Sequence, residues 1–127
     1  RLESTDVQFS EIHCKSIGNN IEAGYEAVIN GFSALDCTAV IAYNDMTAVG
    51  IMRAFAEKGL SVPKDISVVG FDDIETIAFP LTTVNIPEYE MGMSAMELLL
   101  ERIKGRKEIR HIVLPTKLIV RGSVAPV

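Results

Sequence analysis

Residues 39–45 read Ala-Val-Ile-Ala-Tyr-Asn-Asp, and residues 66–73 read Ile-Ser-Val-Val-Gly-Phe-Asp-Asp. Each stretch is an apolar run of strand length that ends in polar, acidic residues. The segment between them, residues 46–58, has the spacing of an amphipathic helix. A strand, a helix and a second strand form a β-α-β unit, in which the two strands lie parallel. The sequence therefore predicts parallel strands over residues 39–43 and 66–71, with both acidic ends at the same edge of one sheet.

The rest of the chain alternates between helix and strand signals. Asn19-Asn20 offers an N-cap for a helix over about residues 21–32. Pro87 fits the first turn of a further helix over about residues 88–104, and Gly105 ends it. The remaining strand candidates are short and cover residues 11–14, 81–84, 109–114 and 117–120. This order predicts an α/β fold with an open, mostly parallel sheet and helices on both faces.

Length and charge narrow the class of protein. The chain has 127 residues, 48% hydrophobic residues and a net charge of −5. This length fits a single domain, and the negative charge argues against a surface that grips a phosphate backbone. No segment is long and uncharged enough to predict a membrane span. Cys14 and Cys37 are interpreted as small core residues; together with His13 and His111 they lack the spacing of metal ligands, so neither a metal nor a cofactor is expected.

The acidic strand ends predict a binding site. Open α/β sheets bind ligands outside the carboxyl ends of their strands. A carboxylate such as Asp72 accepts hydrogen bonds from sugar hydroxyls, and the amide of Asn44 both donates and accepts, so the pair suits a polyhydroxylated ligand. Capping of the helix that follows explains Asn44 and Asp45 equally well. Gly70 lies inside the second strand, which is typical of a close approach of another group to the backbone.

Catalysis finds little support in the sequence. It contains no G-x-S-x-G elbow, no P-loop and no G-x-G-x-x-G. His13 and Cys14 are adjacent, so on a strand they point to opposite faces and form no dyad. The strongest enzyme alternative is a metal-dependent phosphotransferase in which Asp72 and Asp73 hold Mg²⁺. The sequence offers no phosphate-binding loop to accompany it.

Several motifs carry a family resemblance. Residues 59–73 read Gly-Leu-Ser-Val-Pro-Lys-Asp-Ile-Ser-Val-Val-Gly-Phe-Asp-Asp, and residues 42–45 read Ala-Tyr-Asn-Asp. Together they resemble the LacI/GalR family of bacterial transcription regulators. Leu-Thr-Thr-Val at 81–84 and Leu-Ile-Val-Arg-Gly-Ser at 118–123 extend the resemblance in the same order. It covers most of residues 18–123, whereas periplasmic sugar-binding proteins share the fold but match these motifs poorly.

The resemblance implies a function and a set of site residues. Members of the family carry a helix-turn-helix headpiece, a hinge and a two-lobed, periplasmic-binding-protein-like core that binds a small molecule, often a sugar, between its lobes. By the family's pattern, Asn44 and Asp72 face that effector. Asn19 stands where many members place an aromatic residue that stacks on the ligand, which asparagine does not do. Ile86 replaces a position that is frequently polar.

The same resemblance implies a domain organisation. Residues 1–127 correspond to the C-terminal lobe of the effector-binding domain, and the helix at about 88–104 would belong to the N-terminal lobe. Without that lobe, we expect this helix to fold back on the sheet or to pack against a second copy. The expected protein is a cytoplasmic homodimer that reaches operator DNA only through a headpiece outside this sequence and has no membrane partner. The alternative to a repressor is the solute-binding protein of a sugar transport system.

Overall fold

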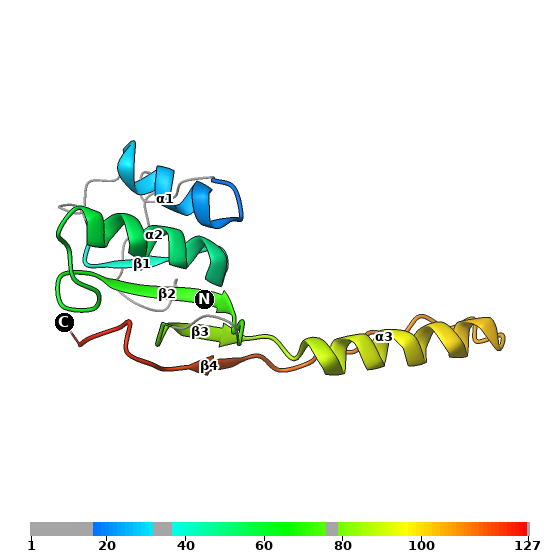
Figure 1. Ribbon diagram of the computed structural model, residues 1–127. Helices are drawn as coiled ribbons and strands as arrows, with labels where there is room; N and C mark the ends of the chain where they lie inside the picture. The colour runs from blue at the N-terminus through cyan, green and yellow to red at the C-terminus, as the bar shows by residue number, and fades with distance from the viewer. Residues whose placement is uncertain (1–16, 32–36, 76–78, 127) are drawn as a thin grey trace.

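The computed structural model describes residues 17–31, 37–75 and 79–126, and its elements follow the predicted order (Figure 1). The helices are α1 (Ile21–Ile29), α2 (Asp45–Glu57) and α3 (Glu88–Ile103). The strands are β1 (Ala39–Ile41), β2 (Ser67–Asp72), β3 (Thr82–Asn85) and β4 (Lys117–Ile119). The strand predicted at residues 109–114 is wrong, because these residues form no ladder with any described strand. The strand predicted at residues 11–14 lies outside the described residues.

The described strands form one open sheet in the order β1-β2-β3-β4. β1 pairs with β2 in parallel, with Val40 opposite Val68, and β2 pairs with β3 in parallel, with Phe71 opposite Val84. β4 runs antiparallel to β3, because the chain reaches it by returning from α3. The predicted α/β class and the parallel pairing of the two acid-ended strands are both confirmed. The expected helices on both faces are not found in the described residues, because α1 and α2 pack together on one face and α3 leaves the sheet (Figure 1).

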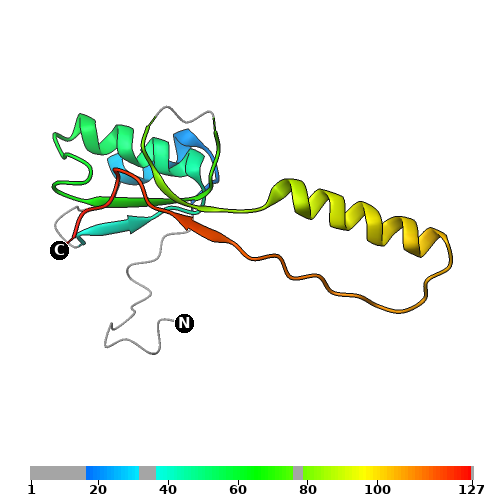
Figure 2. The ribbon, with the colours of Figure 1, turned by 90° about the horizontal axis from the view of Figure 1, so that it is seen from below.

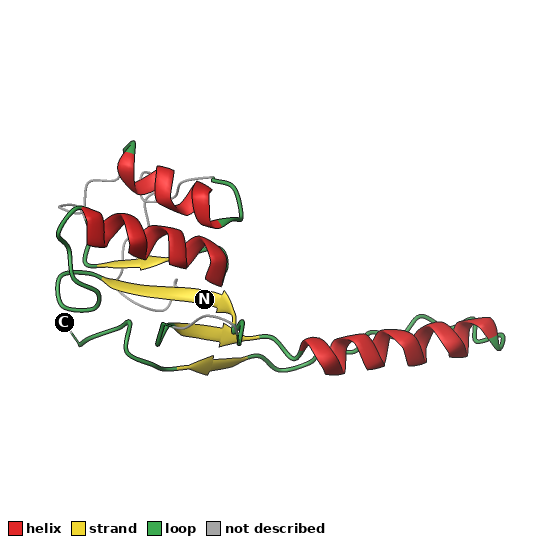
Figure 3. Cartoon of the chain, in the orientation of Figure 1, coloured by secondary structure: helices red, strands yellow, loops and turns green. Residues whose placement is uncertain are grey.

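Helices α1 and α2 lie together over one face of the sheet (Figures 1 and 3). Their inward side chains and those of the strands form one apolar core, whose buried members include Val28, Ile51, Phe55, Ile66, Val68 and Leu81. Lys58 at the end of α2 donates from Nζ to the carbonyl of Val28, 2.7 Å away, which satisfies an orphan carbonyl in the last turn of α1. The two helices and the sheet are therefore fastened at their polar ends as well as through the core.

Glycines allow α1 and α2 to approach each other closely. A Cβ built on Gly50 of α2 would lie 2.8 Å from the backbone nitrogen of Tyr25 and would also overlap the carbonyl of Ile21. A Cβ on Gly24 of α1 would likewise meet the backbone of Thr47. Backbone atoms cannot turn away as a flexible side chain can, so any larger residue must push the helices apart.

Gly50→Ala is therefore expected to destabilise the chain, although alanine normally favours a helix over glycine by about 0.5–1 kcal/mol. Overpacking typically costs about 1–3 kcal/mol, and this overlap with backbone places the variant at or above the upper end. Gly92→Ala is the matched control, because a Cβ on Gly92 in α3 meets nothing within 4 Å. Urea denaturation should show opposite signs for the two variants; a stabilised Gly50→Ala protein would contradict the close helix contact.

Helix α3 projects away from the sheet as an arm (Figures 1 and 2). None of its residues is buried, so the expectation that it folds back on the sheet is wrong. The reason is that β3 and β4 lead the chain past the edge of the sheet, and the returning segment is braced against α3 itself. Arg110 donates to both carboxylate oxygens of Glu101 at 3.0 Å, and Arg106 donates to the carbonyl of Leu98 at 3.2 Å. None of the described helices combines the length and the apolar character that crossing a bilayer requires.

Candidate functional site

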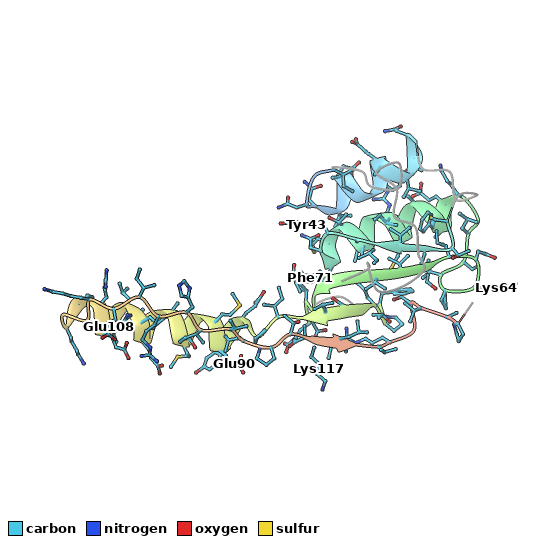
Figure 4. All side chains as sticks on the ribbon, turned by 180° about the vertical axis from the view of Figure 1, so that it is seen from behind. Tyr43, Lys64, Phe71, Glu90, Glu108 and Lys117 are labelled. Carbon is cyan, nitrogen blue, oxygen red and sulfur yellow. The ribbon has the colours of Figure 1, made fainter. Side chains whose placement is uncertain are left out.

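The parallel strands bring the predicted site residues to one edge of the sheet. Asn44 follows β1 as the N-cap of α2, and Asp72 is the last residue of the neighbouring strand β2. Figure 4 shows Tyr43 and Phe71, the residues just before them, at this same carboxyl edge. The topology thus creates the edge that the sequence analysis predicted, and the individual side chains there have different tasks.

The amide of Asn44 is largely occupied by the fold. Its Oδ1 accepts from the backbone nitrogen of Thr47 at 2.8 Å, which caps α2, and its Nδ2 donates to the carbonyl of Asn19 at 3.0 Å. The capping explanation of Asn44 is therefore correct. One amide hydrogen and one lone pair remain for a ligand. The hydrogen bond from Asn44 Nδ2 to the carbonyl of Asn19 places these two residues side by side. Asn19 directly precedes Asn20, which is the N-cap of α1.

Asp45 is a buried carboxylate that links the elements around the candidate site through hydrogen bonds. It is 1% exposed, and its Oδ1 accepts from Thr83 Oγ1 at 2.6 Å while its Oδ2 accepts from the backbone nitrogen of Ile74 at 2.9 Å. These bonds join α2, β3 and the turn after β2. A Cβ on Gly70 would collide with Asp45 Oδ1, so Gly70 makes room for this carboxylate. Sequence reasoning considered Asp45 as a helix cap or as a ligand residue, and not as a buried tie. The glycine inside β2 was the signal that pointed to a close neighbour.

Asp72 is the carboxylate that the fold leaves open. Its side chain makes no hydrogen bond or ion pair with any residue in the described parts of the chain, and its backbone has φ 111°. Partial burial raises the pKa of Asp72 above its ordinary value, and repulsion from Asp45 and Glu88 adds to the effect. A strained backbone that places a partly buried, unpaired carboxylate at a sheet edge is typical of a ligand site. Hydrogen-bond donors from a ligand would relieve its electrostatic cost.

The neighbouring Asp73 points to a different set of partners. Its Oδ1 accepts from Arg121 Nη2 at 2.6 Å and its Oδ2 accepts from Asn85 Nδ2 at 3.1 Å. Asp73 therefore serves the protein rather than an open site. In the described ranges, no group of three or more His, Cys, Asp or Glu side chains is placed to hold a metal ion. The Mg²⁺ alternative built on Asp72 and Asp73 gains no support from this geometry.

Comparison with known proteins places the chain in a family. Residues 2–124 match the model of the periplasmic binding protein-like domain. A curated relative, the HTH-type transcriptional regulator MalR of Streptomyces coelicolor, is 47% identical over 106 residues, which are 80% of this chain and 31% of that protein. The chain thus spans about a third of the length of this relative.

Solved structures agree with this placement. A LacI family transcriptional regulator from Enterococcus faecalis V583, solved with bound ribose, superposes with a TM-score of 0.77 and 35% identity over 87% of this chain and 43% of that one. The transcriptional regulator CelR in complex with cellobiose superposes with a TM-score of 0.86 and 32% identity over 96% of this chain and 39% of that one. The chain belongs to the periplasmic binding protein-like domains of the LacI/GalR family of transcription regulators.

Proposed function

We propose that this chain is the C-terminal lobe of the effector-sensing domain of a cytoplasmic transcriptional repressor, and that its effector is a sugar or a related compound. The observation that carries the proposal is Asp72, an unpaired carboxylate on a strained turn at the carboxyl edge of the sheet. Relatives of similar fold have been solved with ribose and with cellobiose. Binding, rather than catalysis, explains such a site, so we do not expect an enzyme.

The charges at this edge favour an uncharged ligand. Asp72 is repelled by Asp45 and Glu88. The guanidinium of Arg121 is engaged by Asp73 and by the carbonyl of Leu81. The ammonium of Lys117 belongs to β4, two strands away from Asp72. An anionic group placed beside Asp72 would first meet the negative charges of Asp72, Asp45 and Glu88. Paired hydroxyls can instead donate to both oxygens of Asp72, while the remaining amide hydrogen of Asn44 donates to the ligand. The role of Asn19 in this scheme is a polar contact at the rim.

The arm supports the proposed two-lobed organisation. Helix α3 exposes an apolar face to solvent, formed by Met91, Met93, Met96, Leu99, Leu100 and Ile103. Exposed apolar surface costs roughly 25 cal/mol per Å², and continuous patches of this kind mark contact surfaces. We assign this face to the interior of an N-terminal lobe, with the effector enclosed between the two lobes. Operator DNA would be contacted by a headpiece that lies outside residues 1–127.

We also propose that the regulator is a homodimer. Beside α2, an apolar groove of about 600 Å³ is lined by residues that include Val49, Ala56, Leu60, Val62 and Phe79. In a two-fold dimer the same patch of each subunit takes part in the contact, so this one groove can form the interface. Sedimentation equilibrium of an Ala56→Glu variant, which changes an exposed position, checks this assignment: an unchanged dimer would exclude the groove.

The proposed function is tested in a protein that joins these residues to a headpiece and an N-terminal lobe. We expect neutral sugars, assayed as a panel that includes ribose and cellobiose, to change operator affinity, whereas sugar phosphates do not. Residues 1–127 alone should bind neither sugar nor operator specifically, because one side of a cleft desolvates little of a ligand. Sugar binding without any operator binding would favour a transport protein instead. A response to sugar phosphates alone would contradict the charge argument.

A further inference from the structure

The turn that carries Asp72 has a backbone that must be held in place. Asp72 and Asp73 both have positive φ angles, 111° and 61°, and neither is glycine. Such a backbone conformation is strained for a residue with a side chain and persists only where surrounding contacts impose it. The bond from the Ile74 nitrogen to Asp45 fixes one end of the turn. The direction of the Asp72 side chain therefore depends on which contacts hold the middle of this turn.

Asp73 provides that contact, and its two partners come from distant parts of the chain. Asn85 is the last residue of β3, from which the chain leaves for α3, and Arg121 follows β4, on which it returns. Arg121 is itself fixed, because its Nη1 donates to the carbonyl of Leu81 at 2.9 Å and its backbone nitrogen donates to Thr82 Oγ1 at 2.9 Å. Asp73 therefore fastens the turn to the end of β3, where the chain leaves for α3, and to the segment that follows β4.

We propose that Asp73 is a positioning residue for effector recognition, which aims the Asp72 carboxylate by fastening its turn to Asn85 and Arg121. The ion pair with Arg121 is partly buried, since the Asp73 side chain is 17% exposed and the Arg121 side chain 38%. A pair so placed is screened less by salt than a fully exposed pair. Because the anchors lie at the end of β3 and just after β4, a ligand that moves Asp72 also pulls on the two strands that join the sheet to the arm. This inference rests on the proposed function only in taking Asp72 as the effector's acceptor.

The orientation of Asp72 can be followed directly in residues 1–127 by carbon-detected NMR titration of its carboxyl group. Burial and the charges of Asp45 and Glu88 raise the pKa of Asp72 above its ordinary value. If the turn is no longer held and the Asp72 side chain moves into water, its pKa should return toward that ordinary value. Two variants break the ion pair between Asp73 and Arg121 but change the local charge in opposite directions. Asp73→Asn removes a negative charge, and Arg121→Met removes a positive charge. We expect both to lower the pKa of Asp72. Arg121→Lys, which keeps a cation at this position, should retain more of the shift than Arg121→Met.

A positioning role and a purely electrostatic effect predict opposite changes in the pKa of Asp72 for Arg121→Met. If Asp73 and Arg121 act on Asp72 only through their charges, Asp73→Asn lowers the pKa of Asp72 and Arg121→Met raises it, and the proposal is overturned. Unchanged values in both variants overturn it as well. Circular dichroism confirms folding of each variant; should Asp73→Asn not fold, the sign of the change in Arg121→Met decides alone. Because no sugar is needed, failure here is distinguishable from failure of the proposed function.

Discussion

Asp72→Ala is expected to weaken effector binding by roughly tenfold to more than a hundredfold in a protein that joins these residues to a headpiece and an N-terminal lobe. Removal of a charged hydrogen-bond partner typically costs on the order of 1.5–3 kcal/mol. Operator affinity without effector should stay nearly unchanged, because in the proposed organisation operator DNA is contacted by the headpiece and not by this edge. Isothermal titration calorimetry with a sugar to which the wild-type protein responds measures the change.

The control for this substitution is Glu26→Gln, which removes a carboxylate from an exposed position on α1. It should leave sugar affinity at the wild-type value. Equal affinities of the wild-type protein and Asp72→Ala would remove Asp72 from the site and with it the main support for the proposed function. Loss of binding in both variants would point instead to a general electrostatic effect.

The same residue should have the opposite effect on stability. Burial, Asp45 and Glu88 raise the pKa of Asp72 in the folded chain, so between the unfolded and folded pKa the folded state binds more protons than the unfolded state. The free energy of unfolding then falls as pH rises through this interval, and ionised Asp72 destabilises the fold at neutral pH. Asp72→Asn is therefore expected to stabilise residues 1–127 at pH 7. Below the ordinary pKa of aspartate, about 3.9, the gain should vanish.

Urea denaturation of the wild-type chain and Asp72→Asn at both pH values tests this sign. A gain at pH 7 that disappears in acid identifies the ionised carboxylate as its source. Equal gains at both pH values would instead point to the backbone, since asparagine tolerates positive φ better than most residues. A destabilised Asp72→Asn protein would show that the carboxylate has a partner that stabilises its ionised form.

Local signals were sufficient for the β-α-β unit. Apolar runs at 39–43 and 66–71 predicted the strands β1 and β2, although β1 is largely exposed rather than buried. Lys58 followed by Gly59 ends the helix between them through chemistry within a single turn. The same signals failed at residues 109–114. Their alternating apolar residues satisfy a strand pattern, but a strand also needs an edge to pair with, and here the chain runs beside a helix instead.

The sequence predicted which residues meet at the candidate site but not the role of each one. Parallel topology placed Asn44 and Asp72 at one edge. That Asn44 caps α2 follows from a local bond to the Thr47 nitrogen. Its second bond, from Nδ2 to the carbonyl of Asn19, joins residues 25 apart, and no local pattern reports it. The roles of Asp45 and Asp73 depend in the same way on partners in β3 and after β4. Side chains whose hydrogen bonds cross between elements therefore need the structure for their assignment.

The position of α3 raises the question of what covers its apolar face, and Leu99→Glu answers it. In residues 1–127 alone Leu99 is 53% exposed, so the substitution should leave the free energy of unfolding almost unchanged and should reduce self-association through this face. In the joined protein the same side chain would lie inside the N-terminal lobe. Loss of an apolar contact and burial of an unpaired charge then cost on the order of 3–5 kcal/mol.

Glu97→Gln, on the exposed polar side of the same helix, is the matched control and should be tolerated in both proteins. Light scattering of residues 1–127 and thermal unfolding of the joined protein provide the two readouts. The assignment requires opposite behaviour of Leu99→Glu: a neutral or improved fragment, and a joined protein that loses its folded N-terminal lobe and its response to sugar. If the joined protein tolerates Leu99→Glu, α3 does not belong to the interior of that lobe. Its apolar face must then serve a contact between copies, because exposed methionine and leucine side chains on this scale would otherwise cost stability without return.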